Sequence, residues 1–314
     1  MPRKIIIDTD PGQDDAVAML LALASPEEIE VTAVVTVAGN VPLAKTTINA
    51  AKVLELAGRQ DVPLHAGCEQ PVGRETLVTA EHVHGPSGLD GPELPDPSIR
   101  PREKHGVEFL IETLRNEAPG AITLCTLGPL TNVATALRKA PDIAARIGEI
   151  VMMGGAYFEV GNITPTAEFN IYVDPEAADL VLQSGVPITM HPLDVTHSAL
   201  TTPERLDRIA ALGNACGSAV AAMLSFSETF DMEKYGSPGG PLHDPCVIAY
   251  LLQPDLFRGR HINVSVETEG RLTTGMTVAD YWRVTDRPPN VHFVRSVDDD
   301  GFFRLLTERL GRLP

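Results

Sequence analysis

Cysteine is scarce in this sequence, with four among 314 residues. They stand at Cys68, Cys125, Cys216 and Cys246, and no two of them form a CxxC pair of the kind that binds zinc or carries out redox chemistry. A chain of this length can also bury a full core without disulfide cross-links. We therefore interpret the four as reduced, mostly buried thiols, which favours a cytoplasmic protein.

Long apolar runs are missing as well. The longest covers residues 16–24, whereas a membrane-spanning helix needs roughly 20 apolar residues. Near the N-terminus only three apolar residues separate Lys4 from Asp8, too few for the apolar core of a secretory signal. The sequence therefore predicts neither membrane insertion nor export.

Positive charge is in short supply. Lys and Arg number 25 against 42 Asp and Glu, which gives a net charge of −17 at pH 7. Nucleic acids and anionic membranes are bound through basic surfaces, so we expect neither as a partner. Hydrophobic residues make up 43% of the chain and no change of composition marks a linker, so we expect one globular domain over residues 1–314.

The first half alternates between strand and helix patterns. Apolar, β-branched stretches that predict strands occupy residues 4–8, 31–37, 63–66, 121–127, 149–153 and 188–190. Helical patterns lie between most of them, at residues 14–23, 43–57, 104–116, 130–139 and 175–183. This alternation indicates an α/β fold with a mainly parallel sheet covered by helices on both faces. Such sheets bind ligands at the carboxyl ends of their strands.

The second half is richer in helical patterns, at residues 203–212, 215–230, 244–252 and 302–310. Residues 262–269 and 271–274 are interpreted as a hairpin around Gly270. Tyr281 and Trp282 are expected in the core.

Four carboxylates are concentrated where the first strand meets the first helix, in residues 8–15, which read DTDPGQDD. Pro11 and Gly12 supply the turn. One acid in the first turn of a helix is ordinary capping, but four acids close together repel one another and raise one another's pKa. A hard divalent cation relieves that repulsion, and all-oxygen ligands favour Ca²⁺ or Mg²⁺. The motif therefore predicts a metal site.

A further acid, Asp244, stands far along the chain between His243 and Pro245. On its own this pattern is that of a helix N-cap followed by proline at the first helical position. Polar residues also follow several predicted strands, as in the segments 39–40, 127–132 and 162–170. Because the carboxyl ends of parallel strands share one edge of a sheet, these residues are expected to converge at one pocket.

Residues 8–15, 36–40 (TVAGN), 167–170 (AEFN) and 243–245 (HDP) together closely resemble the nucleoside hydrolase family. The resemblance runs from about Lys4 to the final helix, and it is greatest to the inosine–uridine-preferring branch, which carries a histidine before the distal acid. It implies an open, Rossmann-like fold and an enzyme that hydrolyses the N-glycosidic bond of ribonucleosides such as inosine and uridine. A homo-oligomer, either dimer or tetramer, is implied as well.

The resemblance also implies one Ca²⁺ per chain and a set of site residues. The implied metal ligands are the side chains of Asp10, Asp15 and Asp244 and the backbone carbonyl of Leu127. The implied substrate-binding residues are Asp14, Asn40, His84, Met153, Asn162, Glu168, Asn170 and Phe230. By the same resemblance Asp8 supports the turn, while His82, two residues before His84, is expected to point away from the pocket.

The implied mechanism uses Asp10 as the general base on a water molecule and His243 as the acid that protonates the departing base. The C–N bond then breaks through a cation-like sugar. Phe230 is a departure from the family, because some relatives carry a tyrosine there and its hydroxyl is lost. No Lys or Arg occurs in these motifs, so 5′-nucleotides are expected to be rejected.

Two other functions share part of the pattern. Phosphohydrolases of the haloacid-dehalogenase type place an Asp-x-Asp pair after their first parallel strand, but they need a lysine near the phosphate and a later acidic pair. The acidic run at residues 298–300 adjoins the last helix and is interpreted as its cap. A calcium-stabilised sugar-binding module for transport would normally be exported, and no signal for export is seen.

Overall fold

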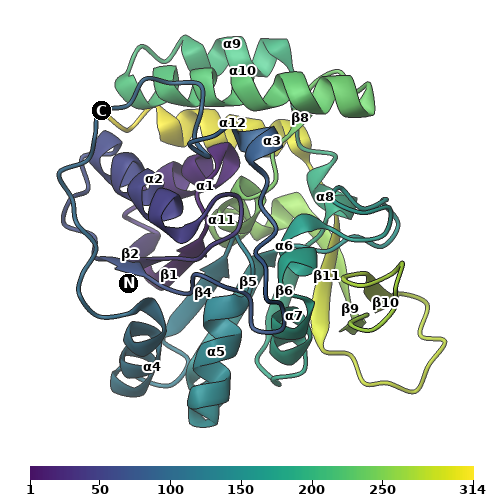
Figure 1. Ribbon diagram of the computed structural model, residues 1–314. Coiled ribbons are helices and arrows are strands. Elements are labelled where there is room, and N and C mark those ends of the chain that lie inside the picture. Colours follow the sequence, from purple (N-terminus) through teal and green to yellow (C-terminus); the bar gives the residue numbers. More distant parts are fainter.

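A computed structural model describes the backbone of residues 1–314 and every side chain except those of Glu228, Asp231, Glu233 and Tyr235. Within this description, nine strands form one sheet in the order β10-β9-β11-β6-β5-β4-β1-β2-β3 (Figure 1). Those strands are β1 (Arg3–Thr9), β2 (Ile29–Thr36), β3 (Leu64–Ala66), β4 (Ile122–Thr126), β5 (Ile147–Met153), β6 (Ile188–His191), β9 (Phe257–Val266), β10 (Thr277–Asp280) and β11 (Val291–Val297).

The sheet is parallel from β3 to β11, and β9 runs antiparallel to both β11 and β10. A small antiparallel pair, β7 (Leu200–Thr201) and β8 (Gly240–Pro241), lies apart from it. The predicted α/β class with a mainly parallel sheet is therefore confirmed.

Helices cover both faces of the sheet (Figure 1). The helices on one face are α1 (Gln13–Leu23), α2 (Leu43–Leu56), α10 (Ala215–Tyr235), α11 (Pro245–Leu252) and α12 (Asp299–Leu310), with α9 (Pro203–Ala210) stacked outside them. The helices on the other face are α4 (Gly106–Asn116), α5 (Thr131–Lys139) and α7 (Pro175–Leu182). Short helices fill the connections: α3 (Glu81–His84), α6 (Phe169–Val173), α8 (Leu193–Thr196), and the 3₁₀ turns η1 (Pro141–Arg146) and η2 (Pro254–Leu256).

The central strand β1 shows why the sheet needs helices on both sides. Successive side chains of a strand point to opposite faces. Ile5 and Ile7 pack into the core with α1, while Ile6 packs into the core with α4 and α5, and all three are fully buried. A strand with apolar residues on both faces must be covered by helices on both faces, and β1 accordingly lies in the middle of the sheet. The acids that follow β1 therefore lie where the carboxyl ends of the parallel strands meet.

The predicted hairpin strand at residues 271–274 is wrong. These residues form a turn in which the amides of Thr273 and Thr274 donate to the carbonyl of Gly270, at 3.0 and 2.8 Å. Gly275 closes the turn with a φ of +83°, a conformation that favours glycine. The true partner of β9 is β10, six residues further along than the prediction placed it.

Other differences lie near the C-terminal half of the chain. Helix α10 continues to Tyr235, five residues past the predicted end, and α12 begins at Asp299 rather than at Phe302. Strand β11 was not predicted at all. Trp282 is 69% exposed, so the expectation that it lies in the core is wrong.

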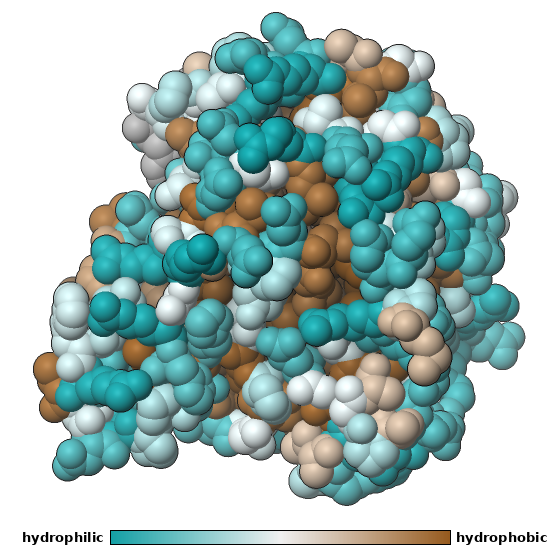
Figure 2. Space-filling view, turned by 180° about the vertical axis from the view of Figure 1, so that it is seen from behind, coloured by the Kyte–Doolittle hydropathy of each residue, from teal (hydrophilic) through white to brown (hydrophobic). Residues whose placement is uncertain are grey.

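The cysteines and the molecular surface agree with what the composition predicts. The four cysteines are free thiols and three of them are buried, as predicted, while Cys68 is half-buried. The face opposite to that of Figure 1 is largely hydrophilic, with hydrophobic residues visible in recesses near its middle (Figure 2). Of the helices that the structure describes, none is long and apolar enough to cross a lipid bilayer.

Candidate active site

The turn from β1 to α1 brings the DTDPGQDD segment to the carboxyl edge of the sheet. Gly12 is the N-cap of α1, and its amide donates to Oδ2 of Asp15 at 3.0 Å. Oδ1 of Asp15 accepts a hydrogen bond from the hydroxyl of Thr9. Asp15 therefore caps the helix, but capping does not account for the other acids of the segment.

Asp10 is fully buried and lies between two glycines. Its Oδ2 accepts a hydrogen bond from the amide of Asn40 at 2.7 Å, whereas its Oδ1 has no hydrogen-bond partner among the described groups. A Cβ on Gly39 would stand 2.0 Å from Oδ2, and a Cβ on Gly128 would stand 2.1 Å from Oδ1. Glycine is therefore required at both positions if the carboxylate is to lie where it does.

Asp244 comes from the distant helix α11 and meets the acids of α1. Carboxylate oxygens of Asp14, Asp15 and Asp244 all lie within 4.8 Å of one another. Asp244 occupies the N-cap position of α11, followed by Pro245, but its side chain makes no capping hydrogen bond. The capping interpretation of Asp244 therefore fails, and its carboxylate is available to the acid cluster.

The ionised acids of this cluster are unfavourable without a cation. Burial first, and neighbouring carboxylates second, raise the pKa of Asp10 and Asp244 well above the usual range. The same two causes raise the pKa of Asp15 to about 6, and burial raises that of Asp14. Together with the unpartnered Oδ1 of Asp10, this all-oxygen donor set fits a hard divalent cation.

The carbonyl of Leu127 follows directly after β4 and accepts a hydrogen bond from Nδ2 of Asn170 at 2.6 Å. A carbonyl oxygen has two lone pairs, so this bond leaves one lone pair for another partner. Asn170 also reaches the Met153 carbonyl at 3.4 Å, which ties the ends of β4 and β5 to α6.

A cavity opens over the acid cluster and encloses about 860 Å³, including the space at its mouth. Among the residues that the sequence singled out, the ones lining it are Asp14, Asp15, Asn40, His84, Leu127, Met153, Asn162, Glu168, Asn170, Phe230, His243 and Asp244. Asp10 lies behind this lining.

Glu168 and Asn162 both line the cavity. The Glu168 carboxylate caps α6 by accepting from the amides of Asn170 and Ile171, at 2.9 and 3.2 Å, and it also accepts from the Gly155 amide at 3.0 Å. Burial nevertheless raises its pKa to about 7. Oδ1 of Asn162 accepts from the Phe169 amide at 2.8 Å, so its side-chain nitrogen is the group left to donate.

His243 lies beside the acids, with Nδ1 2.7 Å from the hydroxyl of Thr196. Burial, with a smaller contribution from His197 and His84, lowers the pKa of His243 to about 3. The imidazole is therefore neutral at pH 7 in this structure. If Thr196 donates to Nδ1, the ring proton lies on Nε2, where a neutral imidazole can donate a hydrogen bond.

The loop before α4 brings two histidines to the cavity, and one of them differs from expectation. Nδ1 of His84 lies 2.6 Å from Oε1 of Gln13, and Gln13 also donates to the carbonyls of His84 and Asp90. His82, which was expected to point away, lines the cavity, and its ring meets the ring of Phe230 edge-to-face at 5.6 Å. That prediction is wrong because the short helix α3 presents both histidines.

Several residues of the lining were missed, among them Gln13 and Lys234. Gln13 stands inside the DTDPGQDD motif, so its position was a usable signal. Lys234 lies on the last turns of α10, beyond the predicted end of that helix, and no pattern in the sequence pointed to it.

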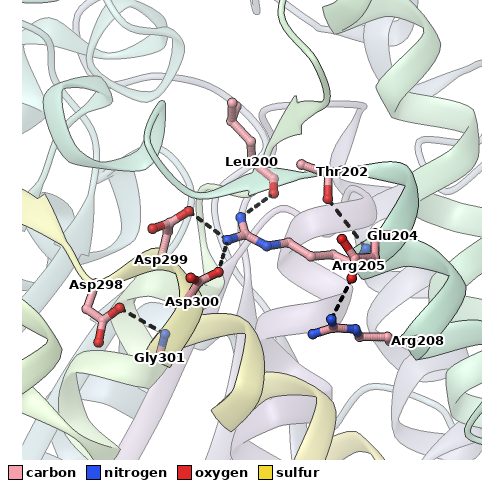
Figure 3. Close-up of polar contacts among 9 residues, drawn as sticks. All are labelled: Leu200, Thr202, Glu204, Arg205, Arg208, Asp298, Asp299, Asp300 and Gly301. Carbon is pink, nitrogen blue, oxygen red and sulfur yellow. Dashed lines mark hydrogen bonds and ion pairs between the residues drawn. The ribbon is translucent and has the colours of Figure 1, made fainter.

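The acidic run at residues 298–300 is not part of the lining of this cavity. Asp298 caps α12 by accepting from the Gly301 amide at 3.0 Å, as predicted (Figure 3). Asp299 and Asp300 each accept from Arg205 at 2.7 Å. Asp299 and Asp300 thus connect α12 to α9, and this run does not supply the later acidic pair that a phosphohydrolase would need.

The fold and the site define a nucleoside hydrolase, an enzyme that cleaves N-glycosyl bonds. The model of the inosine–uridine preferring nucleoside hydrolase family matches residues 5–304, and the chain belongs to that family.

Among curated proteins, an uncharacterized protein of Schizosaccharomyces pombe is 57% identical over 99% of this chain and 100% of its own length. The pyrimidine-specific ribonucleoside hydrolase RihA of Photobacterium profundum is 48% identical over 99% of both chains. A solved plant nucleoside hydrolase superposes with a TM-score of 0.92 at 36% identity, covering 99% of each chain. A purine-preferring ribonucleoside hydrolase from Gardnerella vaginalis superposes with a TM-score of 0.91 at 32% identity, covering 98% of each.

Proposed function

We propose that this chain is a calcium-dependent ribonucleoside hydrolase that prefers pyrimidine nucleosides. The observation that carries the proposal is the arrangement of three carboxylates within 4.8 Å of one another at the floor of a cavity whose wall supplies Asn40, Asn162 and Asn170. Carboxylates and amides suit a cation and a polyhydroxylated sugar, and they suit a phosphate poorly.

The residues proposed to hold Ca²⁺ are Asp10, Asp15 and Asp244, with the carbonyl of Leu127. Asp14 is the alternative to Asp10, because Asp14 and not Asp10 belongs with Asp15 and Asp244 to the group of carboxylates whose oxygens lie within 4.8 Å of one another. A bound calcium ion supplies positive charge that orders the ribose hydroxyls and acidifies a neighbouring water.

Asp10 is proposed as the general base, since its Oδ1 has no hydrogen-bond partner and can accept a proton from the attacking water. The water oxygen forms the new bond to C1′ while the C1′–N bond breaks. The electron pair of that bond goes to the base nitrogen, which needs a proton to leave easily. Nearby ionised carboxylates stabilise the positive charge that develops on the sugar.

His243 is proposed to protonate or hydrogen-bond the departing base. Its Nδ1 is engaged by Thr196, so Nε2 is the atom that can face the base. Glu168 and Asn162 are proposed to bind the 5′ end of the ribose, because Asn162 has a free amide nitrogen to donate and Glu168 can only accept unless it is protonated.

The pyrimidine preference is supported by the names of relatives at 48–49% identity, whereas the relative named as purine-preferring is 32% identical. By resemblance we also propose one domain over residues 1–314, a homo-oligomer and a cytoplasmic location.

The test is release of free ribose from uridine, cytidine, inosine and adenosine, compared by kcat/KM, with and without a calcium chelator. The proposal expects activity that calcium restores and values for uridine and cytidine above those for the purines. Equal or higher values for inosine would overturn the base preference. Phosphate release from a phosphomonoester without ribose release would overturn the reaction class.

A further inference from the structure

Lys234 connects two walls of the cavity. It stands on the last turns of α10, and of the side chains that the structure describes in the lining, it is the one Lys or Arg. Its ammonium donates to the backbone carbonyl of Asn162 at 2.7 Å, across to the loop between β5 and α6. The same ammonium lies 5.3 Å from the ring centroid of Phe230, one turn earlier on α10.

The contact falls on the residue that the proposed function assigns to the ribose. Asn162 is held on its side chain by the Phe169 amide at 2.8 Å and on its backbone by Lys234 at 2.7 Å. These two bonds fix both the backbone carbonyl and the side-chain amide of Asn162. Its remaining donor, the side-chain nitrogen, therefore keeps one direction relative to the cavity.

The rest of α10 is packed against other elements. Its strongest packing is with α9, β8 and α1, none of which carries Asn162 or Glu168. The loop has hydrogen bonds of its own, such as Gly161 to Pro165 and Ile163 to Ala167, and its first two amides, those of Tyr157 and Phe158, donate to the Asp194 carboxylate at 3.0 and 2.7 Å. Among the described side chains of α10, Lys234 makes the hydrogen bond that ties this helix to the part of the loop that carries Asn162.

We propose that Lys234 is a positioning residue: it latches the loop at residues 157–165 to α10, so that Asn162 meets the 5′ hydroxyl of a bound ribonucleoside. The proposal rests on the proposed function for the place of the ribose. The latch itself rests only on the contacts of Lys234.

A second effect of the same ammonium must be separated from this one. Lys234 also contributes to lowering the pKa of His197, whose ring lies 5.8 Å from that of His243 and whose Nδ1 lies 3.5 Å from Glu159. A purely electrostatic role would act on the base end and would not depend on the 5′ hydroxyl of the substrate.

The experiment compares Lys234→Met and Lys234→Arg with the wild type on uridine and on 5′-deoxyuridine. Lys139→Met is the matched control, because it removes a half-exposed lysine that pairs with Glu108 on α4, outside the cavity lining. A hydrogen bond from a charged donor supports a loss of roughly tenfold in kcat/KM for Lys234→Met on uridine, mainly through KM. On 5′-deoxyuridine the loss should be less than about twofold, and Lys234→Arg should stay within about threefold of the wild type on both.

Amide hydrogen exchange without substrate gives an independent readout. Residues 157–165 should exchange faster in Lys234→Met than in the wild type or in Lys139→Met. Equal losses on both substrates, or unchanged exchange in the loop, would overturn the latch. Wild-type protein inactive on every nucleoside would refute the proposed function alone, and the exchange measurement would still decide on the latch.

Discussion

Replacing Asp10 with asparagine separates the metal-binding role of this acid from its structural role. Asparagine has nearly the same shape, and its oxygen can still accept from the Asn40 amide, the 2.7 Å bond that Asp10 makes. What it loses is the charge that a cation needs. We expect Asp10→Asn to have no measurable turnover on uridine and no calcium-dependent rise in melting temperature.

The size of the calcium effect can be worked out from linkage. A ligand at 100 times its Kd stabilises the folded state by about 2.7 kcal/mol. Unfolding entropy of roughly 2.1 cal/mol/K per residue gives about 0.7 kcal/mol/K for 314 residues. The wild type should therefore melt about 4 °C higher with calcium than with chelator.

Without calcium the variant should be at least as stable as the wild type. Burial and Asp15 raise the pKa of Asp10 well above its usual range, and each unit of such a shift represents about 1.4 kcal/mol at a pH above the folded pKa. The amide carries no such cost. Removing one of the acids thus lowers the electrostatic repulsion in the calcium-free protein.

Asp8→Asn is the matched control. Asp8 is equally buried in the same motif, and burial raises its pKa to about 7, but its carboxylate accepts a hydrogen bond from Asn132 and no neighbouring carboxylate contributes to that rise, whereas Asp15 and Asp14 contribute to the rise for Asp10. It should keep the calcium shift. Differential scanning calorimetry of both variants, with calcium or chelator, provides the measurement. A full calcium shift in Asp10→Asn, or near-normal turnover, would refute the reasoning.

Three more outcomes are expected. His243→Ala should lower kcat/KM on uridine by roughly 10²–10⁴-fold but on 4-nitrophenyl riboside by less than about tenfold, since that leaving group needs no proton; equal losses would leave His243 a positional role. Burial raises the pKa of Glu168 to about 7 and, with help from Asp14, that of Asp15 to about 6, so folding without calcium takes up protons and stability is lost as the pH rises through these values. Calcium should therefore raise the melting temperature more at pH 8 than at pH 5.5, and a larger rise at pH 5.5 would contradict the assignment. Uridine should be preferred to uridine 5′-monophosphate by at least about a hundredfold at matched ionic strength, because a like-charge contact with Glu168 at 4 Å costs on the order of 4 kcal/mol, which Lys234 offsets in part; comparable kcat/KM values would show that the 5′ end lies elsewhere.

Much of the fold was predictable where the chain alternates strand and helix. The run from Ile5 to Ile7 is buried on both faces of the sheet, and so its apolar character was unbroken and easy to interpret. The hairpin after Gly270 was misplaced because Thr-rich residues 271–274 have strand composition, while the hydrogen bonds to Gly270 and the left-handed Gly275 turn the chain there. Composition does not reveal which of the two adjacent stretches, residues 271–274 or 277–280, pairs with β9.

Part of the candidate site was also predictable from the sequence, and part of it was not. The acids of the DTDPGQDD motif could be identified as site residues from the sequence, because four carboxylates so close together repel one another unless a cation is bound. Asp244 could be interpreted as a cap or as a ligand until the structure showed no capping bond. Lys234 could not be found from sequence, because its role depends on a contact over 72 residues to Asn162 and on five helical residues that the pattern did not predict.

Gly39 and Gly128 lie on two sides of the Asp10 carboxylate, so close that a Cβ on either residue would overlap one of its oxygens. In a library of random substitutions, these two positions would be depleted as severely as the catalytic acids, although they contribute no functional group. Exchanging Asp10 for glutamate would fail for the same reason, since the extra methylene has nowhere to go between them. The tolerance of this enzyme to mutation is thus limited by the two glycines beside Asp10 as much as by its charged residues.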